Sequence, residues 1–258
     1  MPSRLILAGW SQLMIWFIGT AGAGGVPGRA KNCILVDTGD ARLLLDVGPG
    51  CVERLYELGY SACDVDYIYI SHLHMDHWSG LFDYAVRYSV EGCSQPPTLL
   101  AGEKVRDQLS SVIETLPGRL RGEVGARSIP ASGGLELDGM LIRVYEAVHT
   151  LPAYTVEVIV DGSTLVYSGD TGPTGKLREL ASRTDLLVVE ASMPRGMEVK
   201  ARETGHHTVD EAAAYRDQMR SEALLVLTHL TRESLEDIRR HGLPRRVIAA
   251  SDGLVLSI

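Results

Sequence analysis

Short apolar runs alternate along the chain with segments whose apolar residues follow helical spacing. The runs at residues 14–18, 65–70 and 186–190 are short and continuous, which is typical of buried strands. Residues 81–90 and 209–219 instead repeat apolar positions every three to four residues, as one face of a helix does. Strands separated by helices predict an α/β (α+β) protein.

Two turn signals locate further strands. Asp161-Gly162, the strongest hairpin signal, joins predicted strands 155–160 and 163–168, and Thr38-Gly39-Asp40 marks a second hairpin. Other predicted strands lie at 32–36, 41–47, 98–101, 140–148, 224–228 and 246–258, and other helices at 52–58, 104–115, 176–182 and 233–241. Residues 117–134 have little pattern. No repeat or long linker divides the chain, so we expect one domain, residues 1–258, of two facing sheets with helices outside.

The N-terminus has a loose likeness to a signal peptide. Residues 5–18 are largely apolar, but Gly9, Ser11 and Gln12 interrupt them, and the stretch is too short to span a bilayer. We interpret residues 1–12 as an extension or an extra strand. We expect a cytoplasmic protein without a membrane segment.

Composition narrows the classes of partner. The 258 residues are 45% apolar and 22% charged, with a net charge of −8, as in an ordinary globular protein. The densest basic pairs, Arg239-Arg240 and Arg245-Arg246, fall short of the clusters of a nucleic-acid binder. The composition therefore argues against a non-specific nucleic-acid binder, but it allows a small anionic substrate held by metal.

Four cysteines, Cys33, Cys51, Cys63 and Cys93, have no Cys-x-x-Cys spacing, so no zinc finger is indicated. We expect buried free thiols. The chain has one Asn and four Gln, and this scarcity of thermolabile amides predicts a heat-adapted source. Intracellular disulfides occur in such organisms, so pairing of some cysteines is the alternative.

Four candidate metal ligands lie within six residues, directly after the predicted strand 65–70: His72, His74, Asp76 and His77. In an extended segment, His72 and His74 point the same way, and Asp76 and His77 follow after the chain has turned. One ion rarely takes four ligands packed so tightly, but two neighbouring ions can share them. Imidazole and carboxylate suit zinc, with manganese, iron or cobalt as alternatives.

Three later predicted strands also end near a candidate ligand: His149, Asp170 and His229. A purely structural interpretation of these residues predicts no such coincidence. Ligands at strand ends converge when the strands lie side by side in one sheet, because the loops beyond them share one edge. We therefore expect these residues to meet the cluster around His72.

The pattern His72-x-His74-x-Asp76-His77, followed by His149, Asp170 in Ser-Gly-Asp-Thr, and His229, resembles the metallo-β-lactamase superfamily over essentially the whole chain. The resemblance implies a four-layer αββα sandwich with a two-metal site at one edge. It assigns His72, His74 and His149 to one ion and Asp76, His77 and His229 to the other. Asp170 would bridge the two.

Within the superfamily, the chain looks most like ribonuclease Z and its relatives. The residues that indicate this are Phe17 to Gly24, Leu45-Asp46-Val47-Gly48, Glu190-Ala191-Ser192, Gly205-His206 and Leu227-Thr228-His229. In that family, the histidine matching His206 assists the leaving group and the glutamate matching Glu190 helps to position it. The resemblance also implies a homodimer.

Two departures argue against tRNA as substrate. The family's tRNA-gripping arm would lie between His149 and Asp170, but these residues are only 21 apart and a tight hairpin fills the interval. Val189 also stands where the family has a histidine. The catalytic core is thus present without the polynucleotide handle, and tRNA 3′-end cleavage becomes a minor alternative.

These residues predict a binuclear metal-dependent hydrolase that cleaves phosphoesters, most simply a phosphodiesterase on small or nucleotide-like substrates. A metal-bridging hydroxide would attack in line. Asp76, Glu190 and His206 are the predicted catalytic residues, and His206 would donate a proton to the leaving group. Asp46 and Ser71 would orient ligand histidines through their other ring nitrogens.

Two other functions stay open. One is a carboxylic ester, lactone, thioester or sulfate ester hydrolase at the same site, in which Tyr145, Tyr154 or Tyr167 would lie near the substrate. The other is a non-catalytic metal-binding protein, which the presence of all seven ligand positions argues against.

Overall fold

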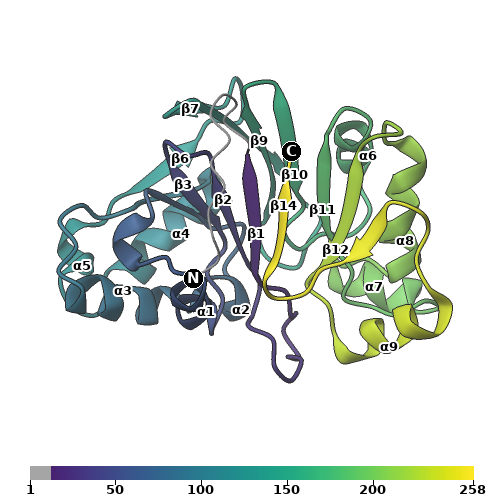
Figure 1. Cartoon of the computed structure of the whole chain (residues 1–258), viewed down its shortest axis with the longest axis horizontal. Helices are drawn as coiled ribbons and strands as arrows, with labels where there is room; N and C mark the ends of the chain where they lie inside the picture. Colours follow the sequence, from purple (N-terminus) through teal and green to yellow (C-terminus); the bar gives the residue numbers. More distant parts are fainter. Residues whose placement is uncertain (1–12) are drawn as a thin grey trace.

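The computed structural model describes residues 13–258 and has two seven-stranded sheets packed face to face, with helices on the outer face of each (Figure 1). This is the predicted αββα sandwich. The extension or extra strand predicted for residues 1–12 lies outside the described residues. No helix of residues 13–258 is long and apolar enough to cross a membrane.

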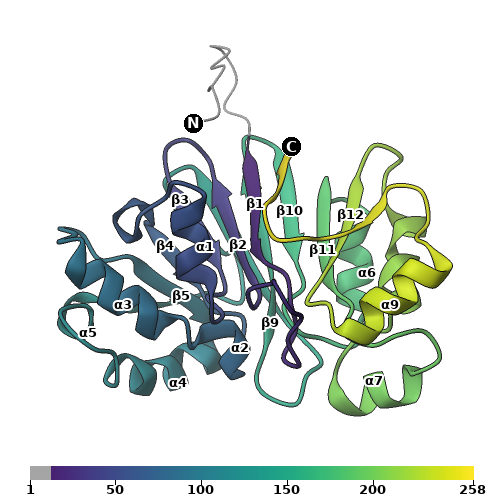
Figure 2. The same ribbon diagram turned by 60° about the horizontal axis from the view of Figure 1, so that its bottom comes forward.

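The first sheet has the strand order β14-β1-β2-β3-β4-β5-β6. Its strands are β1 (Met14–Gly19), β2 (Cys33–Asp37), β3 (Arg42–Leu45), β4 (Tyr67–Tyr69), β5 (Thr98–Gly102), β6 (Ala126–Ile129) and β14 (Leu254–Ser257). Its helices are α1 (Cys51–Glu57), η1 (Ala62–Asp64), α2 (Met75–Trp78), α3 (Leu81–Val90), α4 (Glu103–Ile113) and α5 (Leu120–Glu123). Apart from α2, which lies at the sheet edge, the larger helices cover its outer face (Figure 2).

The second sheet has the order β13-β12-β11-β10-β9-β8-β7. Its strands are β7 (Leu135–Leu137), β8 (Met140–Glu146), β9 (Tyr154–Val160), β10 (Ser163–Tyr167), β11 (Leu186–Glu190), β12 (Leu224–Thr228) and β13 (Val247–Ala249). Its helices are α6 (Gly175–Ala181), α7 (Glu198–Thr204), α8 (Val209–Ala213), η2 (Ala214–Gln218) and α9 (Arg232–His241).

Strand alternation divides the buried side chains between two cores. In β11, Leu186 and Val188 point into the core between the sheets, whereas Leu187 and Val189 pack against the outer helices. Because both faces of β11 are covered, its sequence is a continuous apolar run rather than an alternating one. Val189, the departure from the family histidine, thus lies in the helix layer.

The strand directions bring the candidate ligands to one edge. β8 and β10 both pair antiparallel with β9, and β10, β11 and β12 are parallel, so β8, β10 and β12 end on the same side. However, β4, which precedes His72, belongs to the first sheet. The expectation that neighbouring strands of a single sheet deliver the ligands was wrong, because the site lies across both sheets.

Several helices and strands were not predicted, because their sequences have weak apolar periodicity. α7 was missed because only Ala201 of its seven residues is buried, which leaves no apolar periodicity. The segment without pattern contains α5 and β6. The helix predicted over residues 209–219 was wrong in its second half, since α8 ends at Ala213 and continues as the 3₁₀ helix η2.

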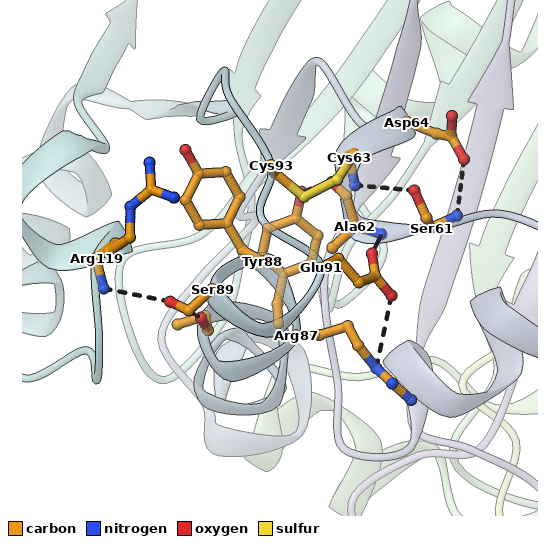
Figure 3. The surroundings of a disulfide bond; sticks show 12 residues. Ser61, Ala62, Cys63, Asp64, Arg87, Tyr88, Ser89, Glu91, Cys93 and Arg119 are labelled. Atoms are coloured by element: carbon orange, nitrogen blue, oxygen red, sulfur yellow. Dashed lines mark hydrogen bonds and ion pairs between the residues drawn. A yellow bond between two sulfur atoms is a disulfide. The ribbon is translucent and has the colours of Figure 1, made fainter.

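The cysteines correct another expectation. Cys33 pairs with Cys51 and Cys63 with Cys93, and none of the four is free. Cys63 is also exposed. Figure 3 shows that the second disulfide joins η1 to the turn after α3. Free thiols were the wrong prediction because pairing depends on Cα separations, here 6.0 and 5.1 Å, that only the fold sets.

Candidate metal centre

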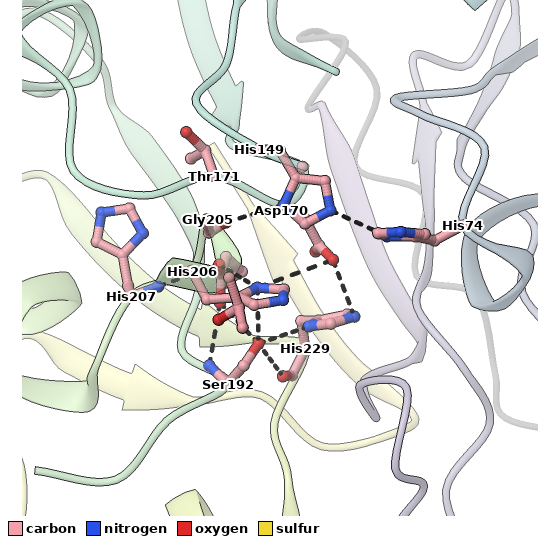
Figure 4. A network of polar contacts seen from close by, with 12 residues as sticks. His74, His149, Asp170, Thr171, Ser192, Gly205, His206, His207 and His229 are labelled. Carbon is pink, nitrogen blue, oxygen red and sulfur yellow. Dashed lines mark hydrogen bonds and ion pairs between the residues drawn. The ribbon is translucent and has the colours of Figure 1, made fainter. Parts of the chain in front are cut away.

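All seven predicted ligands meet at the common edge of the two sheets. His72 and His74 lie between β4 and α2, and Asp76 and His77 lie within α2. The other three follow the ends of β8, β10 and β12, and Figure 4 shows their side chains turned toward one another: His149, Asp170 and His229.

One group consists of His72, His74, His149 and Asp170, whose nearest donor atoms all lie within 4.8 Å of one another. His74 Nδ1 lies 2.9 Å from His149 Nε2 and 3.1 Å from His72 Nε2. Asp170 Oδ2 lies 3.6 Å from His72 Nε2. The nitrogens therefore face a common point from three sides.

A second group consists of Asp76, His77 and His229. His229 Nε2 lies 3.1 Å from both His77 Nε2 and Asp76 Oδ2. Asp170 also reaches this group, with its carboxylate oxygens 3.3 Å from His77 Nε2 and 3.5 Å from His229 Nε2. Asp170 thus stands between the two groups, where the resemblance puts the bridging ligand.

On the first-sheet side, one carboxylate orients two histidines. Asp46 Oδ2 accepts a hydrogen bond from His77 Nδ1 at 2.7 Å and from the Ser71 hydroxyl at 2.8 Å. Because that hydroxyl has given its only hydrogen to Asp46, His72 Nδ1 must donate to Ser71 Oγ, 3.0 Å away. Asp46 is fully buried, and Tyr167 donates to it as well.

On the second-sheet side, each histidine has a partner of its own. His149 Nδ1 donates to the Gly205 carbonyl at 2.9 Å. Ser192 gives its hydroxyl hydrogen to Glu190, so His229 Nδ1 donates to Ser192 Oγ at 2.8 Å. In both histidines, as in His72, the proton is therefore on the outward nitrogen and Nε2 faces inward.

This arrangement fits cations. The inward Nε2 atoms of His72 and His149 both face His74 Nδ1, and a single proton on His74 could serve only one of them. Within residues 13–258, the buried Oδ1 of Asp170 accepts no hydrogen bond, although His77 Nε2 lies 3.3 Å from it. Buried polar atoms left in this way are costly unless an ion satisfies them. The donor set, imidazole and carboxylate, suits zinc and similar metals.

The charge states agree with this fit. Burial lowers the pKa of His72, His74 and His149, so these rings are neutral, the form that binds a metal. Burial also opposes charge on His77, but Asp170 and Asp46 outweigh it and raise the pKa of His77. A metal that binds there replaces a proton, so metal uptake releases protons.

His206 and Glu190 form a charged pair beside the two groups. His206 Nδ1 lies 2.8 Å from Glu190 Oε1 and 4.0 Å from Asp170 Oδ2. Burial disfavours the protonated ring, but Glu190 overcomes this and raises the pKa of His206 to about 9. Glu190 is itself buried and accepts hydrogen bonds from Ser192 and from the His207 backbone. The pair therefore keeps a proton on His206 at neutral pH.

Sequence reasoning missed some of the residues behind the ligands. Tyr167 was considered only as a residue near a lactone, yet its hydroxyl donates to Asp46 and accepts from Asn32. Ser192 and Gly205 lie in motifs of the resemblance, but nothing in the motifs indicated that they hold His229 and His149. Tyr145 and Tyr154 have partners outside the metal groups, in Glu157 and Lys104.

Comparisons with known proteins identify the family of the chain and its relatives. The model of a family described as "Anti-Pycsar protein Apyc1" matches residues 13–247. Ribonuclease BN from Escherichia coli O1:K1 is 27% identical over an alignment that covers 83% of this chain and 88% of the relative.

Solved structures share the fold. The metallo-β-lactamase fold protein YhfI from Bacillus subtilis has a TM-score of 0.82 at 20% identity, covering 96% of this chain and all of that chain. The short form of human tRNase Z has a TM-score of 0.77 at 24% identity, covering 95% and 99% of the two chains. Zn(2+)-bound PqqB from Methylobacterium extorquens has a TM-score of 0.70 at 16% identity, and the match covers 95% of this chain and 100% of that chain.

Proposed function

The chain belongs to the Anti-Pycsar protein Apyc1 family, in the ribonuclease Z-like branch of the metallo-β-lactamase superfamily, and we propose that it is a phosphodiesterase acting on small or nucleotide-like substrates. A metal-dependent hydrolase is what the relatives and the fold support. The observation that favours phosphodiesters is the pair of His206 and Glu190, which keeps the His206 ring protonated beside the metal groups, with its Nδ1 4.0 Å from Oδ2 of Asp170.

In this proposal, His72, His74, His149 and Asp170 hold one divalent cation, and Asp76, His77, His229 and Asp170 hold a second. We propose zinc, with manganese, iron or cobalt as alternatives, because the donors are nitrogen and carboxylate oxygen. When bound, two such ions would supply Lewis acidity and would lower the pKa of a bound water to about 7. Hydrogen bonds that the rings donate to Asp46, Ser71, Gly205 and Ser192 hold the four histidines in place.

The chain's own proton chemistry centres on His206. Its Nδ1 is held by Glu190, so its Nε2 is the atom that can give a proton to the departing oxygen. A phosphodiester with an alkoxide leaving group needs that proton, because an alkoxide is a poor leaving group. The pKa of about 9 leaves His206 charged and ready to donate at neutral pH.

Small substrates are favoured because no long arm stands between His149 and Asp170. The interval holds β9 and β10, joined by the Asp161-Gly162 turn. The net charge of −8 also opposes a long polyanion. That the protein forms a homodimer, is located in the cytoplasm and comes from a heat-adapted source remain predictions. The two disulfides agree with a cytoplasmic location only for a heat-adapted source.

The test is a hydrolase panel run on protein loaded with defined metals. It compares phosphomonoesters, linear and cyclic nucleotide diesters, bis-p-nitrophenyl phosphate, phosphotriesters, lactones, thioesters and sulfate esters. We expect metal-dependent turnover that is highest for phosphodiesters. Higher kcat/KM for lactones or other carbonyl esters would overturn the phosphodiesterase, and no turnover of any ester would favour a binding protein.

A further inference from the structure

The Cys63–Cys93 disulfide stands beside a carboxylate, and the three side chains form a group that the proposed chemistry does not use. Donor atoms of Cys63, Glu91 and Cys93 all lie within 4.8 Å of one another. Figure 3 shows Glu91 beside the sulfur bridge, between η1 and the turn after α3. The sequence gives no sign of this group, because Cys93 follows Cys63 by 30 residues and only the fold brings them together.

The two disulfides differ in how a reductant can reach them. Cys63 is exposed, whereas Cys93, Cys33 and Cys51 are buried. Exchange begins when a thiolate attacks an accessible sulfur of a disulfide. A dithiol can therefore attack at Cys63. The dithiol gives up two electrons and two protons and becomes a disulfide itself, the bond between the two protein sulfurs breaks, and Cys63 and Cys93 become thiols.

Contacts that involve no sulfur keep the two cysteines together after that bond has broken. The Ala62 N–H donates to Glu91 Oε2 at 2.9 Å, and the Tyr84 hydroxyl donates to the Ala62 carbonyl at 2.6 Å. The Cys93 N–H donates to the Tyr88 carbonyl at 3.2 Å. These hydrogen bonds attach η1 and the turn after α3 to the same helix, so the two thiols stay opposite each other.

The spacing of the two cysteines suits a metal ion as well as a disulfide. Their Cα atoms are 5.1 Å apart. Two zinc–sulfur bonds of about 2.3 Å at a tetrahedral angle place the sulfurs about 3.8 Å apart, which rotation about the Cα–Cβ bonds can provide. Thiolates are soft ligands that select zinc and similar soft ions. A Glu91 oxygen supplies a third donor, and water on the exposed side of Cys63 supplies a fourth.

The charges around the group favour a cation. Burial raises the pKa of Tyr84, and the carboxylates of Asp66, Glu91 and Asp64 raise it further, so this part of the molecule carries a negative potential. Arg87 Nε lies 3.8 Å from Glu91 Oε1, which is a loose ion pair. A carboxylate has about four lone-pair sites, so Glu91 can accept from Ala62 and face Arg87 and still bind a second cation.

We propose that Cys63, Glu91 and Cys93 bind a thiophilic divalent cation such as zinc once the disulfide has been reduced. The cation takes the place of the two thiol protons, and its uptake releases both. η1 and the turn after α3 are then joined under either condition, by the disulfide in oxidising surroundings and by the metal ion in reducing ones. None of the three residues belongs to the metal centre, so this second site does not depend on the hydrolase function proposed above.

The experiment reduces the zinc-loaded full chain with dithiothreitol, removes the reductant by gel filtration without air, and adds Cd²⁺ while the ultraviolet absorbance is recorded. Cadmium is the probe because a cadmium–thiolate bond gives a charge-transfer band. The imidazole and carboxylate ligands of the metal centre give no such band, so that centre does not contribute. We expect a band that saturates at one equivalent of Cd²⁺ in the reduced protein and is absent from the oxidised protein.

Two variants and a control examine the ligands. Cys63→Ser, which leaves the other disulfide intact, should abolish the band. Glu91→Gln keeps an oxygen for the Ala62 N–H but loses the charge, and it should weaken cadmium binding about tenfold or more. Glu179→Gln is the matched control, since Glu179 is exposed on α6 and lies outside the group.

Cadmium should also raise the unfolding temperature of the reduced wild type, but not that of reduced Cys63→Ser. A band that persists in Cys63→Ser would assign it to Cys33 and Cys51 and overturn the proposal. Equal cadmium affinity in Glu91→Gln and wild type would do the same for the role of the carboxylate. The site is also disproved by a missing band in protein whose Cys63 and Cys93 are shown to be free thiols by alkylation and mass spectrometry.

Discussion

The two sheets contribute to the site in different ways. The first-sheet region supplies four donors within six residues, His72 to His77, and a single carboxylate, Asp46, orients two of its histidines. The second-sheet region supplies His149, Asp170 and His229 from three separate strand ends, and each histidine has its own partner. A compact motif can share one support, whereas dispersed donors depend on several loops at once.

Covalent support differs as well. Both disulfides lie in the first-sheet region, where Cys33–Cys51 joins β2 to α1 and Cys63–Cys93 joins η1 to the turn after α3. The second-sheet region has no cysteine. Its ligands are held by hydrogen bonds and by the packing of α6, α8 and η2 on β10–β12. Heat and reductant should therefore affect the two regions differently.

The largest effect is expected at the residue that both metal groups share. Asp170→Asn removes a charge that contacts His72, His77 and His229. Turnover should fall by about 10³-fold or more. This exceeds the loss of about 10–100-fold that is typical when a residue behind a metal ligand is removed. Phosphodiester hydrolysis and zinc content by mass spectrometry check this. Near-normal zinc content and turnover would contradict a bridging role.

Removing the proton donor comes next. His206→Ala should lower kcat about 10²–10⁴-fold for a nucleotide diester. Bis-p-nitrophenyl phosphate should be affected less, because p-nitrophenolate leaves with little need for a proton. His241→Ala is the control, since His241 is exposed on α9 and its side chain pairs with Asp237, outside the metal groups. Equal losses on both substrates would show that His206 does not protonate the leaving group.

The outer partners test the comparison of the two regions directly. Asp46→Asn should weaken zinc binding by about 10–100-fold, because Asp46 supports both His72 and His77. Ser192→Ala should have a smaller effect, because it removes the partner of His229 alone. Competition with a chromogenic chelator measures both. A larger effect of Ser192→Ala would reverse the comparison.

A pH profile examines the support of His206. Glu190 raises the pKa of His206 to about 9 against the effect of burial. In Glu190→Gln that charge is lost, so His206 loses its proton at lower pH. The basic limb of the kcat profile for a nucleotide diester should therefore move to lower pH. At pH 6, kcat itself should change only modestly. An unchanged basic limb would mean that another group sets it.

The smallest effect on turnover is expected from the Cys63–Cys93 disulfide. Cys63→Ser with Cys93→Ser removes a cross-link between residues 30 apart in the chain and should reduce stability by about 2–4 kcal/mol, while neither cysteine belongs to the metal groups. Thermal unfolding should move to lower temperature, while kcat stays the same. Dithiothreitol should not lower the unfolding temperature of the double variant any further if the buried Cys33–Cys51 disulfide resists reduction.

Much of this protein could be predicted because its sequence has strong local signals. The His72 cluster, the Asp161-Gly162 hairpin and the apolar run of β11 each depend on neighbouring residues, and the structure has all three where they were expected. α7 and β6 could not be predicted, because they bury few side chains.

By itself, the sequence determined the donor atoms, since residue type fixes which groups can bind a metal or carry a proton, and it determined that strand ends would present them. Tertiary structure alone decided which donors meet, because the site lies across two sheets and each histidine is aimed by a partner remote in the chain. It likewise decided the cysteine pairs and the position of Glu91 beside one of them, since both depend on distances between segments, and local spacing contains no information about those distances.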